Sequence, residues 1–175
     1  MAELTQTETL RSDKLILRPL TVDDAVHYAR LLGDDSASIQ MTATIPDPCT
    51  EADAREWLTL RLGRGERMFA ILKAADDEFV GTLGMIQQPG DTFVLGYWVG
   101  RVHAGQGYAS EAVRLVAEYA RRLGAAKLCA ETFPENTASG RVLEKAGFVL
   151  TGTTQHDFPL RGGWRTNNEY ELKLK

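Results

Sequence analysis

At 175 residues, with 43% hydrophobic and 25% charged side chains, the chain is long enough to bury a complete core in one domain. Its net charge of −4 does not provide the cationic surface that binds a phosphate backbone, which argues against nucleic acid as a direct partner. No apolar run approaches the ~20 residues that cross a bilayer, so we expect a soluble protein with no membrane partner.

Cysteine content and the first residues bear on the cellular compartment. Cys49 and Cys129 are too few for a disulfide framework or a metal cluster, so we expect reduced thiols and no bound metal. Residues 1–14 contain no basic stretch followed by an apolar segment, as a secretory signal would. These features predict a cytoplasmic protein. The chain has no repeat, low-complexity tract or linker, which predicts a single domain over residues 1–175.

The first half of the chain predicts one strand, two helices and a meander of strands. Alternating residues predict a strand at 14–18, and two helices follow, each opened by a capping-box pair: Thr21 with Asp24, and Thr50 with Asp53. Between the helices, the polar segment 36–48 has the character of loops that shape substrate pockets. Turn residues then separate three hairpin-linked strands, at 67–74, 79–87 and 92–99.

A helical period begins after the third of these strands. Apolar residues recur at helical spacing over residues 109–123, and Gly124 supplies the stop. A strand at 127–132 follows, and the order strand, helix, strand implies that strands 92–99 and 127–132 are parallel and lie side by side or nearly so. Asn136 then caps a further helix that Gly147 ends, and two strands near 148–155 and 166–174 close the chain. The prediction is an α+β fold: a mixed, mostly antiparallel seven-stranded sheet with helices on both faces.

The turn before the long helix reads HAGQGYAS, residues 103–110. A helix start leaves about four backbone N–H groups without intrahelical partners and carries about half a positive charge, so it favours an anion. Glycines at 105 and 107 would let a phosphate group approach the backbone closely. A G-x-G pair alone decides nothing, but its position between a strand and an amphipathic helix predicts a phosphate-binding turn.

Two other anion-binding loops compete with this interpretation. A P-loop would need Gly-Lys-Ser/Thr, which is absent. A Rossmann fingerprint would place a third glycine at Ser110, although Glu131 stands roughly where the ribose-binding acid would be. Dinucleotide folds alternate strands and helices, so the three hairpin-linked strands before this turn disfavour the Rossmann alternative.

Two motifs carry a family resemblance. They are LGYWVGRVHAGQGYASEAVRLVAEYA at 95–120 and PENTASGRVLEKAGF at 134–148. Together with LILRPLTVDDA at 15–25, they make nearly the whole chain resemble the GNAT superfamily of N-acetyltransferases, and within it the ribosomal-protein N-alpha-acetyltransferase group of the RimJ/RimL type. One departure is Ala104, where the family often has Gln or Arg. The difference removes a side chain but no backbone donor, so the turn keeps its assignment.

The resemblance implies acetyl-CoA as co-substrate and a set of residues that hold it. Backbone groups of Trp98 and Val99 would pair with the pantetheine arm, and one N–H there would polarise the thioester carbonyl. Asn136 would face the pantetheine amides, and Ser139 the sulfur. The pyrophosphate would be wrapped by the turn, which consists of Ala104, Gly105, Gln106, Gly107, Tyr108, Ala109 and Ser110.

The resemblance also directs attention to the proton donors and acceptors. Many members of the superfamily have a Tyr general acid where this chain has Leu143, so Ser139 or a water must protonate the departing thiolate. We expect Ser139, His156 and Asp157 as the catalytic residues, the last two as candidate bases. Further candidate bases are Glu66 and His103. The acceptor pocket is expected to include the cluster His156, Asp157 and Phe158, with Arg161 and Trp164.

The function implied is transfer of an acetyl group from acetyl-CoA to a primary amine. The leading acceptor is the N-terminal α-amino group of a protein or peptide, because an amine with a pKa of about 7.7 to 8.0 is partly neutral near pH 7. Two alternatives stay open: a small amine such as an aminoglycoside, polyamine or amino acid, and a CoA-binding module without turnover. A homodimer is one option for the assembly.

Overall fold

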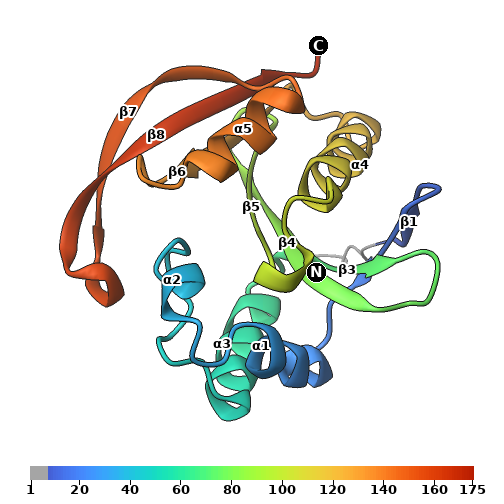
Figure 1. The fold of residues 1–175 in the computed structure, drawn as a ribbon. Coiled ribbons are helices and arrows are strands. Elements are labelled where there is room, and N and C mark those ends of the chain that lie inside the picture. The colour runs from blue at the N-terminus through green and yellow to red at the C-terminus, as the bar shows by residue number, and fades with distance from the viewer. Residues whose placement is uncertain (1–7) are drawn as a thin grey trace.

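A computed structural model describes residues 8–175. Residues 1–7, which belong to the segment expected to contain no secretory signal, lie outside the described residues. Eight strands form one sheet in the order β1-β2-β3-β4-β5-β6-β8-β7 (Figure 1). Their bounds are β1 Leu10–Arg11, β2 Leu15–Pro19, β3 Arg67–Lys73, β4 Phe79–Gln88, β5 Thr92–Val99, β6 Lys127–Thr132, β7 Val149–Phe158 and β8 Gly163–Lys173.

In residues 8–175, five α-helices and three short 3-10 turns connect the strands. The α-helices are α1 Ala25–Leu31, α2 Ser36–Ile39, α3 Glu51–Gly63, α4 Tyr108–Arg122 and α5 Thr137–Lys145. The 3-10 turns are η1 Val22–Asp24, η2 Arg101–His103 and η3 Pro159–Arg161. The predicted caps are confirmed: Thr50 and Asp53 form a capping box at α3, and the Asn136 side chain accepts a hydrogen bond from the Ser139 amide at α5. Within the segment predicted as a loop, the short helix α2 forms.

The α+β prediction is confirmed, with eight strands where seven were expected. β5 and β6 run parallel, and all other neighbouring strands are antiparallel. The additional strand is β1, which pairs Leu10 with Leu17 across a tight turn. Two residues are too few to show the alternation of polar and apolar side chains that reveals a strand, so the sequence contains no signal for β1.

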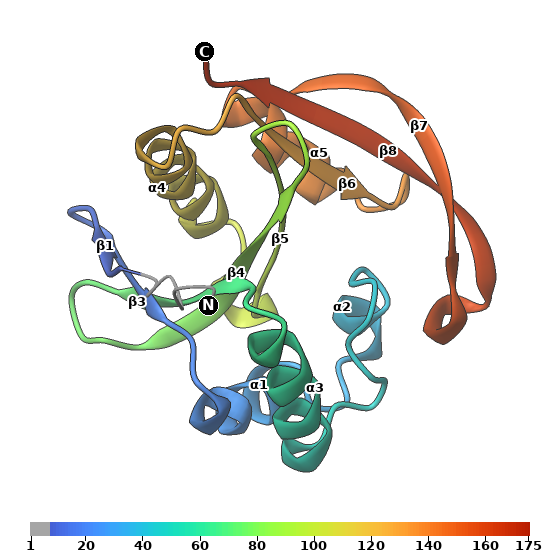
Figure 2. The ribbon, with the colours of Figure 1, turned by 180° about the vertical axis from the view of Figure 1, so that it is seen from behind.

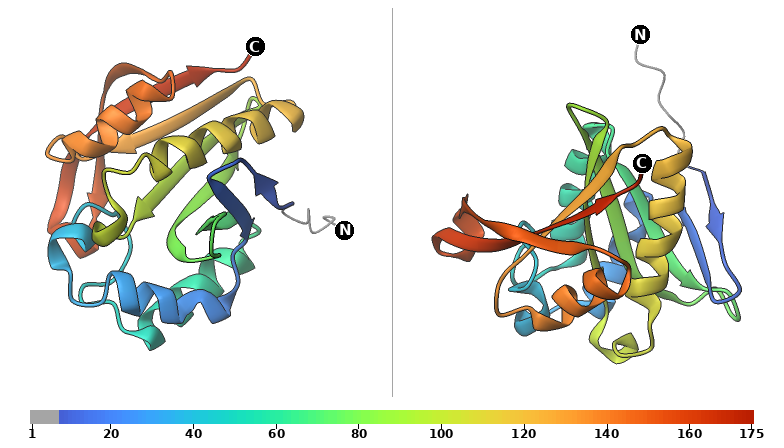
Figure 3. Two further views of the ribbon diagram at one scale, coloured as in Figure 1. Left: turned by 45° about the vertical axis from the view of Figure 1, so that its right-hand side comes forward. Right: turned by 90° about the horizontal axis from the view of Figure 1, so that it is seen from above.

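Helices cover both faces of the sheet, as predicted. α4 and α5 lie on one face, while α1 and α3 lie on the other (Figures 2 and 3). Alternate residues of the central strands supply the two cores, since successive strand residues point to opposite faces. Phe69, Leu83 and Leu95 pack with Val113 and Val116 of α4 on the first face. The second core combines Ala70, Leu72 and Trp98 with Tyr28 of α1 and Leu58 of α3.

The sheet opens between β5 and β6. These strands pair only from Thr92 with Lys127 to Leu95 with Ala130, after which β5 continues without a strand partner on that edge. The long β7–β8 hairpin curves away from the body and brings its tip close to α2 (Figures 1 and 3). In the part of the chain that the structure describes, no helix has the length and apolar character to cross a membrane.

Candidate active site

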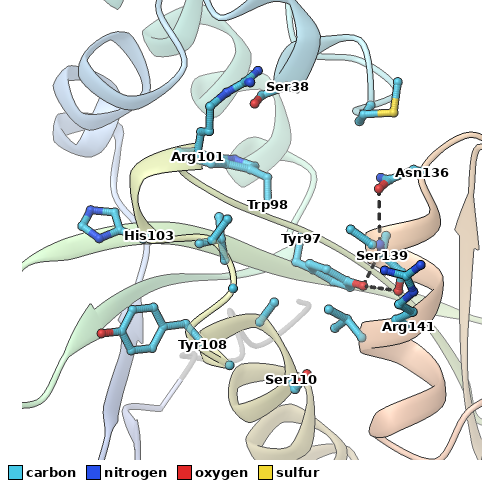
Figure 4. A pocket seen from close by; sticks show the side chains of 18 of the residues that line it. Ser38, Tyr97, Trp98, Arg101, His103, Tyr108, Ser110, Asn136, Ser139 and Arg141 are labelled. Carbon is cyan, nitrogen blue, oxygen red and sulfur yellow. Dashed lines mark hydrogen bonds between the residues drawn. The ribbon is translucent and has the colours of Figure 1, made fainter.

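A cavity of about 460 Å³ lies at the opening of the sheet (Figure 4). Four parts of the chain line it: the end of β5 with η2, the turn before α4, one face of α5, and residues near α2. All but one of the predicted cofactor-binding residues line this cavity. They are Trp98, Val99, Ala104, Gly105, Gly107, Tyr108, Ala109, Ser110, Asn136 and Ser139. The exception is Gln106, whose exposed side chain accepts a hydrogen bond from the Tyr108 hydroxyl over 3.2 Å.

The end of β5 presents free backbone groups to the cavity. The Gly100 amide donates to the Val80 carbonyl over 2.8 Å, so alternate residues of β5, including Trp98, turn their backbone groups toward β4. Val99 therefore turns its N–H and C=O to the opposite edge, where β6 has already diverged. An extended ligand can add to this edge as a further strand would.

The turn before α4 has the shape of an anion cradle. Gly105 and Gly107 adopt φ values of +76° and +82°, and a Cβ at either position would meet no atom within 4 Å, so the backbone is open. Gly107 occupies the N-cap position of α4 and no side chain caps the helix. Among the described residues, the amides of residues 105 to 110 donate to no backbone carbonyl. Unpartnered amides at a helix start can bind an anionic group such as a pyrophosphate.

Three polar side chains meet on the α5 wall of the cavity (Figure 4). Asn136 accepts the Ser139 amide over 3.3 Å, which fixes the first turn of α5. The Tyr97 hydroxyl, which reaches across from β5, lies 2.7 Å from the Ser139 Oγ. Burial raises the pKa of Tyr97 to about 12. Leu143, one helical turn beyond Ser139, is fully buried in the core and does not reach the cavity.

The cavity wall is cationic although the whole chain is acidic. Arg101, Arg141 and Lys145 line the cavity, and none of the described residues that line it is a carboxylate. Arg101 forms a bidentate ion pair with Asp35, at 3.0 and 2.6 Å. Arg141 and Lys145 enter none of the ion pairs found in residues 8–175. The excess of cations suits a ligand with several phosphate groups.

The candidate bases are not gathered at one place. His156 and Asp157 lie on β7 outside the residues that line the cavity, and His156 Nε2 lies 3.1 Å from Glu131. Glu66 pairs with Arg61 over 2.6 Å, also away from the cavity. His103 does line the cavity, but Figure 4 shows it at the far end from Ser139. The structure thus brings Ser139 to the cavity and leaves His156 and Asp157 apart from it.

Arg161 does not line the cavity but binds backbone carbonyls of a neighbouring loop. Its guanidinium is buried and donates to the carbonyls of Thr42, Ile39 and Ile45 at 2.7, 3.0 and 2.5 Å. Burial lowers the pKa of this guanidinium, because the low-polarity surroundings disfavour the charge. The contact ties the tip of the β7–β8 hairpin to the loop after α2, whose Met41 and Thr42 line the cavity.

Several residues that line the cavity had no site role predicted from the sequence, and the polar ones among them include Tyr97, Arg101, Arg141 and Lys145. A signal for Tyr97 existed, because alternation along 92–99 places it on the sheet face opposite to Trp98. A signal for the cations existed too, since Arg141 and Lys145 are four residues apart and share a helix face with each other. What was missing was the direction of that face relative to the sheet.

Solved structures share this architecture. The fold matches that of RimL, a ribosomal-protein alpha-N-acetyltransferase solved in complex with coenzyme A, with a TM-score of 0.80. The identity is 24%, and the match covers 95% of this chain and 98% of that chain. This likeness establishes the fold, and the cradle before α4 is the place within it where an anionic group can bind.

Sequence comparisons then give the family. The Acetyltransferase (GNAT) domain matches residues 14–149, so the chain belongs to the GNAT acetyltransferase family. It is 33% identical over 165 residues to "Probable N-acetyltransferase YjcK" of Bacillus subtilis, covering 89% of this chain and 91% of that protein. It is 32% identical over 155 residues to the ribosomal-protein-serine acetyltransferase of Escherichia coli, covering 83% and 86%. The protein is an acetyl-CoA-dependent N-acetyltransferase, and the predicted family and co-substrate are confirmed.

Bound acetyl-CoA supplies a thioester that an amine can attack, and the rest of the chemistry falls to the residues of the cavity. The open edge of β5 can hold an extended arm, the turn before α4 can hold an anion, and the start of α5 presents a hydroxyl. In residues 8–175, no cluster of three or more His, Cys, Asp or Glu side chains could hold a metal ion.

Proposed function

We propose that the acceptor is the N-terminal α-amino group of a protein or peptide. The observation that carries this proposal is that no carboxylate stands among the described residues lining the cavity. An α-amino group with a pKa of about 7.7 to 8.0 is roughly a fifth neutral near pH 7.3, whereas a lysine amine at about 10.4 is below a thousandth neutral. An α-amine therefore needs little help from a base. The names of two similar proteins, a ribosomal-protein-serine acetyltransferase and a ribosomal-protein alpha-N-acetyltransferase, support the same acceptor class.

The predicted roles of the cavity residues belong to this proposal. The Val99 amide, beside Trp98, donates to the thioester carbonyl, and a single donor of this kind is worth about 3 to 4 kcal/mol at the transition state. The backbone of residues 104 to 110 holds the pyrophosphate. Asn136 faces the pantetheine arm, and Ser139 donates a hydrogen bond to the departing sulfur. His156 and Asp157 act on the acceptor only if the acceptor itself extends from the cavity to β7, where both residues are exposed.

The acceptor is tested with acetyl-CoA and a panel of amines while the free thiol is followed. The panel contains peptides with a free N-terminus, the same peptides with a blocked N-terminus and one internal lysine, and small amines including a polyamine, an aminoglycoside and amino acids. Turnover confined to free N-termini supports the proposal. Turnover confined to small amines would replace it with the small-amine alternative.

The pH dependence provides a separate check on the proposed acceptor. With no carboxylate base among the described residues of the cavity, kcat/KM for a peptide should rise with pH, reach half its maximum at the α-amine pKa of about 7.7 to 8.0, and level off about one pH unit above it. A peptide whose N-terminal residue has a more acidic amine should shift that profile down by the difference in amine pKa. A profile that levels off near pH 6 for every peptide would indicate a base in the protein and contradict the proposal.

A further inference from the structure

The Tyr97 hydroxyl lies within hydrogen-bonding distance of the Ser139 hydroxyl. Its ring stands on β5, faces α5 and is largely buried, and its hydroxyl lies 2.7 Å from the Ser139 Oγ and 3.2 Å from the Ser139 carbonyl oxygen (Figure 4). A separation of about 2.7 Å is the usual length of a good O–H···O hydrogen bond. The two side chains come from elements 42 residues apart in the chain, and both line the cavity.

The distance between the Tyr97 and Ser139 hydroxyls fits either one as the donor, and counting donors and acceptors favours Tyr97. The Tyr97 hydroxyl has one proton and two acceptors within reach, of which Oγ is the closer. The Ser139 carbonyl oxygen lies within α5 and already has a helical amide to accept, so Oγ is the better partner for Tyr97. When Tyr97 donates to Oγ, the proton of Ser139 itself remains available to a group in the cavity.

We propose that Tyr97 is a positioning residue that orients and polarises the Ser139 hydroxyl toward the departing sulfur. The pair would then provide the hydrogen-bond donor that many family members take from a tyrosine at the position of Leu143. This inference rests on the proposed role of Ser139. A chain of two hydroxyls makes the terminal donor stronger than an isolated serine, because hydrogen bonds in series polarise one another. Without Tyr97, the Ser139 hydroxyl loses this side-chain partner and is free to take other rotamers.

Tyr97 keeps its own proton throughout. Transfer releases one proton from the amine nitrogen as the C–N bond forms and leaves one on the sulfur as the C–S bond breaks, so no net proton comes from Tyr97. Burial raises the pKa of Tyr97 to about 12, which holds the phenol in its donor form over the whole range in which the enzyme can be assayed. The geometry therefore assigns it hydrogen-bond donation and not proton transfer.

The test is a double-mutant cycle of Tyr97→Phe and Ser139→Ala, measured with acetyl-CoA and whichever amine the wild-type enzyme accepts. We expect Tyr97→Phe to lower kcat about five- to tenfold, the loss of roughly one hydrogen bond at the transition state, with KM for acetyl-CoA changed by less than about twofold. In the Ser139→Ala background, Tyr97→Phe should change kcat by less than about twofold, because Tyr97 acts only through Ser139.

Tyr170→Phe is the matched control. Tyr170 is buried beneath the same turn of α5. Its hydroxyl lies close to Gly140, 2.7 Å from where a Cβ at that residue would be, and makes no hydrogen bond with a described residue. The variant should keep the wild-type kcat. Full activity of Tyr97→Phe or of Ser139→Ala, or equal losses from Tyr97→Phe with and without Ser139, would overturn the inference. The cycle can be measured with any amine that supports turnover. It therefore still tests the role of Tyr97 if the proposed acceptor, a protein or peptide N-terminus, is wrong.

Discussion

The two sides of the cavity are built in different ways. The cofactor wall, which comprises the end of β5, the turn 104–110 and α5, takes its shape from backbone conformation and from contacts near the sheet. The opposite side, which we call the α2 wall, comprises Ser38, Met41 and Thr42 with Arg161 behind them. Its loop is held by side-chain hydrogen bonds between residues 116 to 122 positions apart.

This difference affects how each wall should respond to a change of side chain. A strand edge and an uncapped helix start can bind a ligand through main-chain groups, so binding at such a site should tolerate many changes of side chain. The α2 wall depends on a single guanidinium and on loop side chains, so small changes there can alter which amine fits. Binding at the cofactor wall should therefore be lost only when a substitution places atoms in the backbone cradle before α4. The shape of the α2 wall should be lost when a single side chain is removed.

The largest effect is expected from Gly107→Glu on the cofactor wall. The added carboxylate and its bulk would occupy the space that a pyrophosphate needs, so affinity for acetyl-CoA should fall about 100-fold or more. A left-handed backbone conformation costs a non-glycine residue about 1 to 2 kcal/mol, so stability should fall as well. Calorimetric titration with acetyl-CoA measures the affinity, and thermal unfolding measures the stability.

Gly124→Glu separates strain from charge in that experiment. Gly124 follows the other end of α4, has a φ of +84°, and a Cβ added there would meet no atom within 4 Å. The same substitution there should lower stability by a similar amount and leave acetyl-CoA affinity within about twofold. If both variants bind acetyl-CoA as the wild type does, the turn before α4 is not the anion site.

The next largest effect is expected from Arg161→Met on the α2 wall. The change removes the donor of the Thr42 and Ile45 carbonyls, while the Ile39 carbonyl keeps the amide and hydroxyl of Thr42. Hydrogen bonds to a charged group are worth about 1.5 to 3 kcal/mol, so the free energy of unfolding should fall by about 2 to 3 kcal/mol. The loop that carries Met41 and Thr42 loses its anchor. We expect KM for the acceptor to rise about tenfold while KM for acetyl-CoA stays within about twofold.

Arg165→Met on the same hairpin is the control for loss of a positive charge. Arg165 pairs with Glu135 and lies over the Phe133 ring instead of binding the α2 loop. The Arg165→Met substitution should lower the free energy of unfolding by about 1 kcal/mol or less, as expected for a partly exposed ion pair, and should leave both KM values unchanged. Equal rises in the two KM values for Arg161→Met would mean that the α2 loop serves the cofactor as much as the acceptor.

The two walls also differ in how far the sequence predicted them. Local signals reveal the cofactor wall: glycines between a strand and a helical period, and an asparagine at a helix start. The contact between Tyr97 and Ser139 could not be read in this way, because it depends on how α5 crosses the sheet. Alternation gives the side of the strand that Tyr97 occupies, but not the residue that it meets.

On the α2 wall the sequence identified the right segments but few of their contacts. The segment 36–48 was predicted to shape a pocket, and part of it does line the cavity. Arg161 was placed in the acceptor pocket, whereas its guanidinium is used within the protein to hold three carbonyls. Composition cannot distinguish an arginine that faces solvent from one that binds backbone oxygens, because both depend on the path of a loop more than a hundred residues away.

The smallest effect is expected at the ion pair that joins the two walls, between Asp35 at the start of α2 and Arg101 beside the cavity. Arg101, together with the Ser38 hydroxyl, lowers the pKa of Asp35 to about 2. A carboxyl group whose pKa is lowered by folding adds stability above its unfolded pKa of about 3.9, and that stability is lost as the pH falls toward 2. Arg101 is exposed and Asp35 is half-buried, so water screens the pair and its contribution should not exceed about 1 kcal/mol.

Asp35→Asn tests this junction, because asparagine can still cap α2 but cannot pair with Arg101. The variant should unfold at slightly lower urea concentration than the wild type at pH 7, and the difference should shrink between about pH 4 and pH 2 and in high salt. Asp34→Asn, at an exposed neighbour that enters no ion pair in residues 8–175, should show no such difference. A gap between Asp35→Asn and wild type that stays constant with pH would mean that the ion pair with Arg101 contributes no stability and that the loss comes from weaker capping of α2 by asparagine.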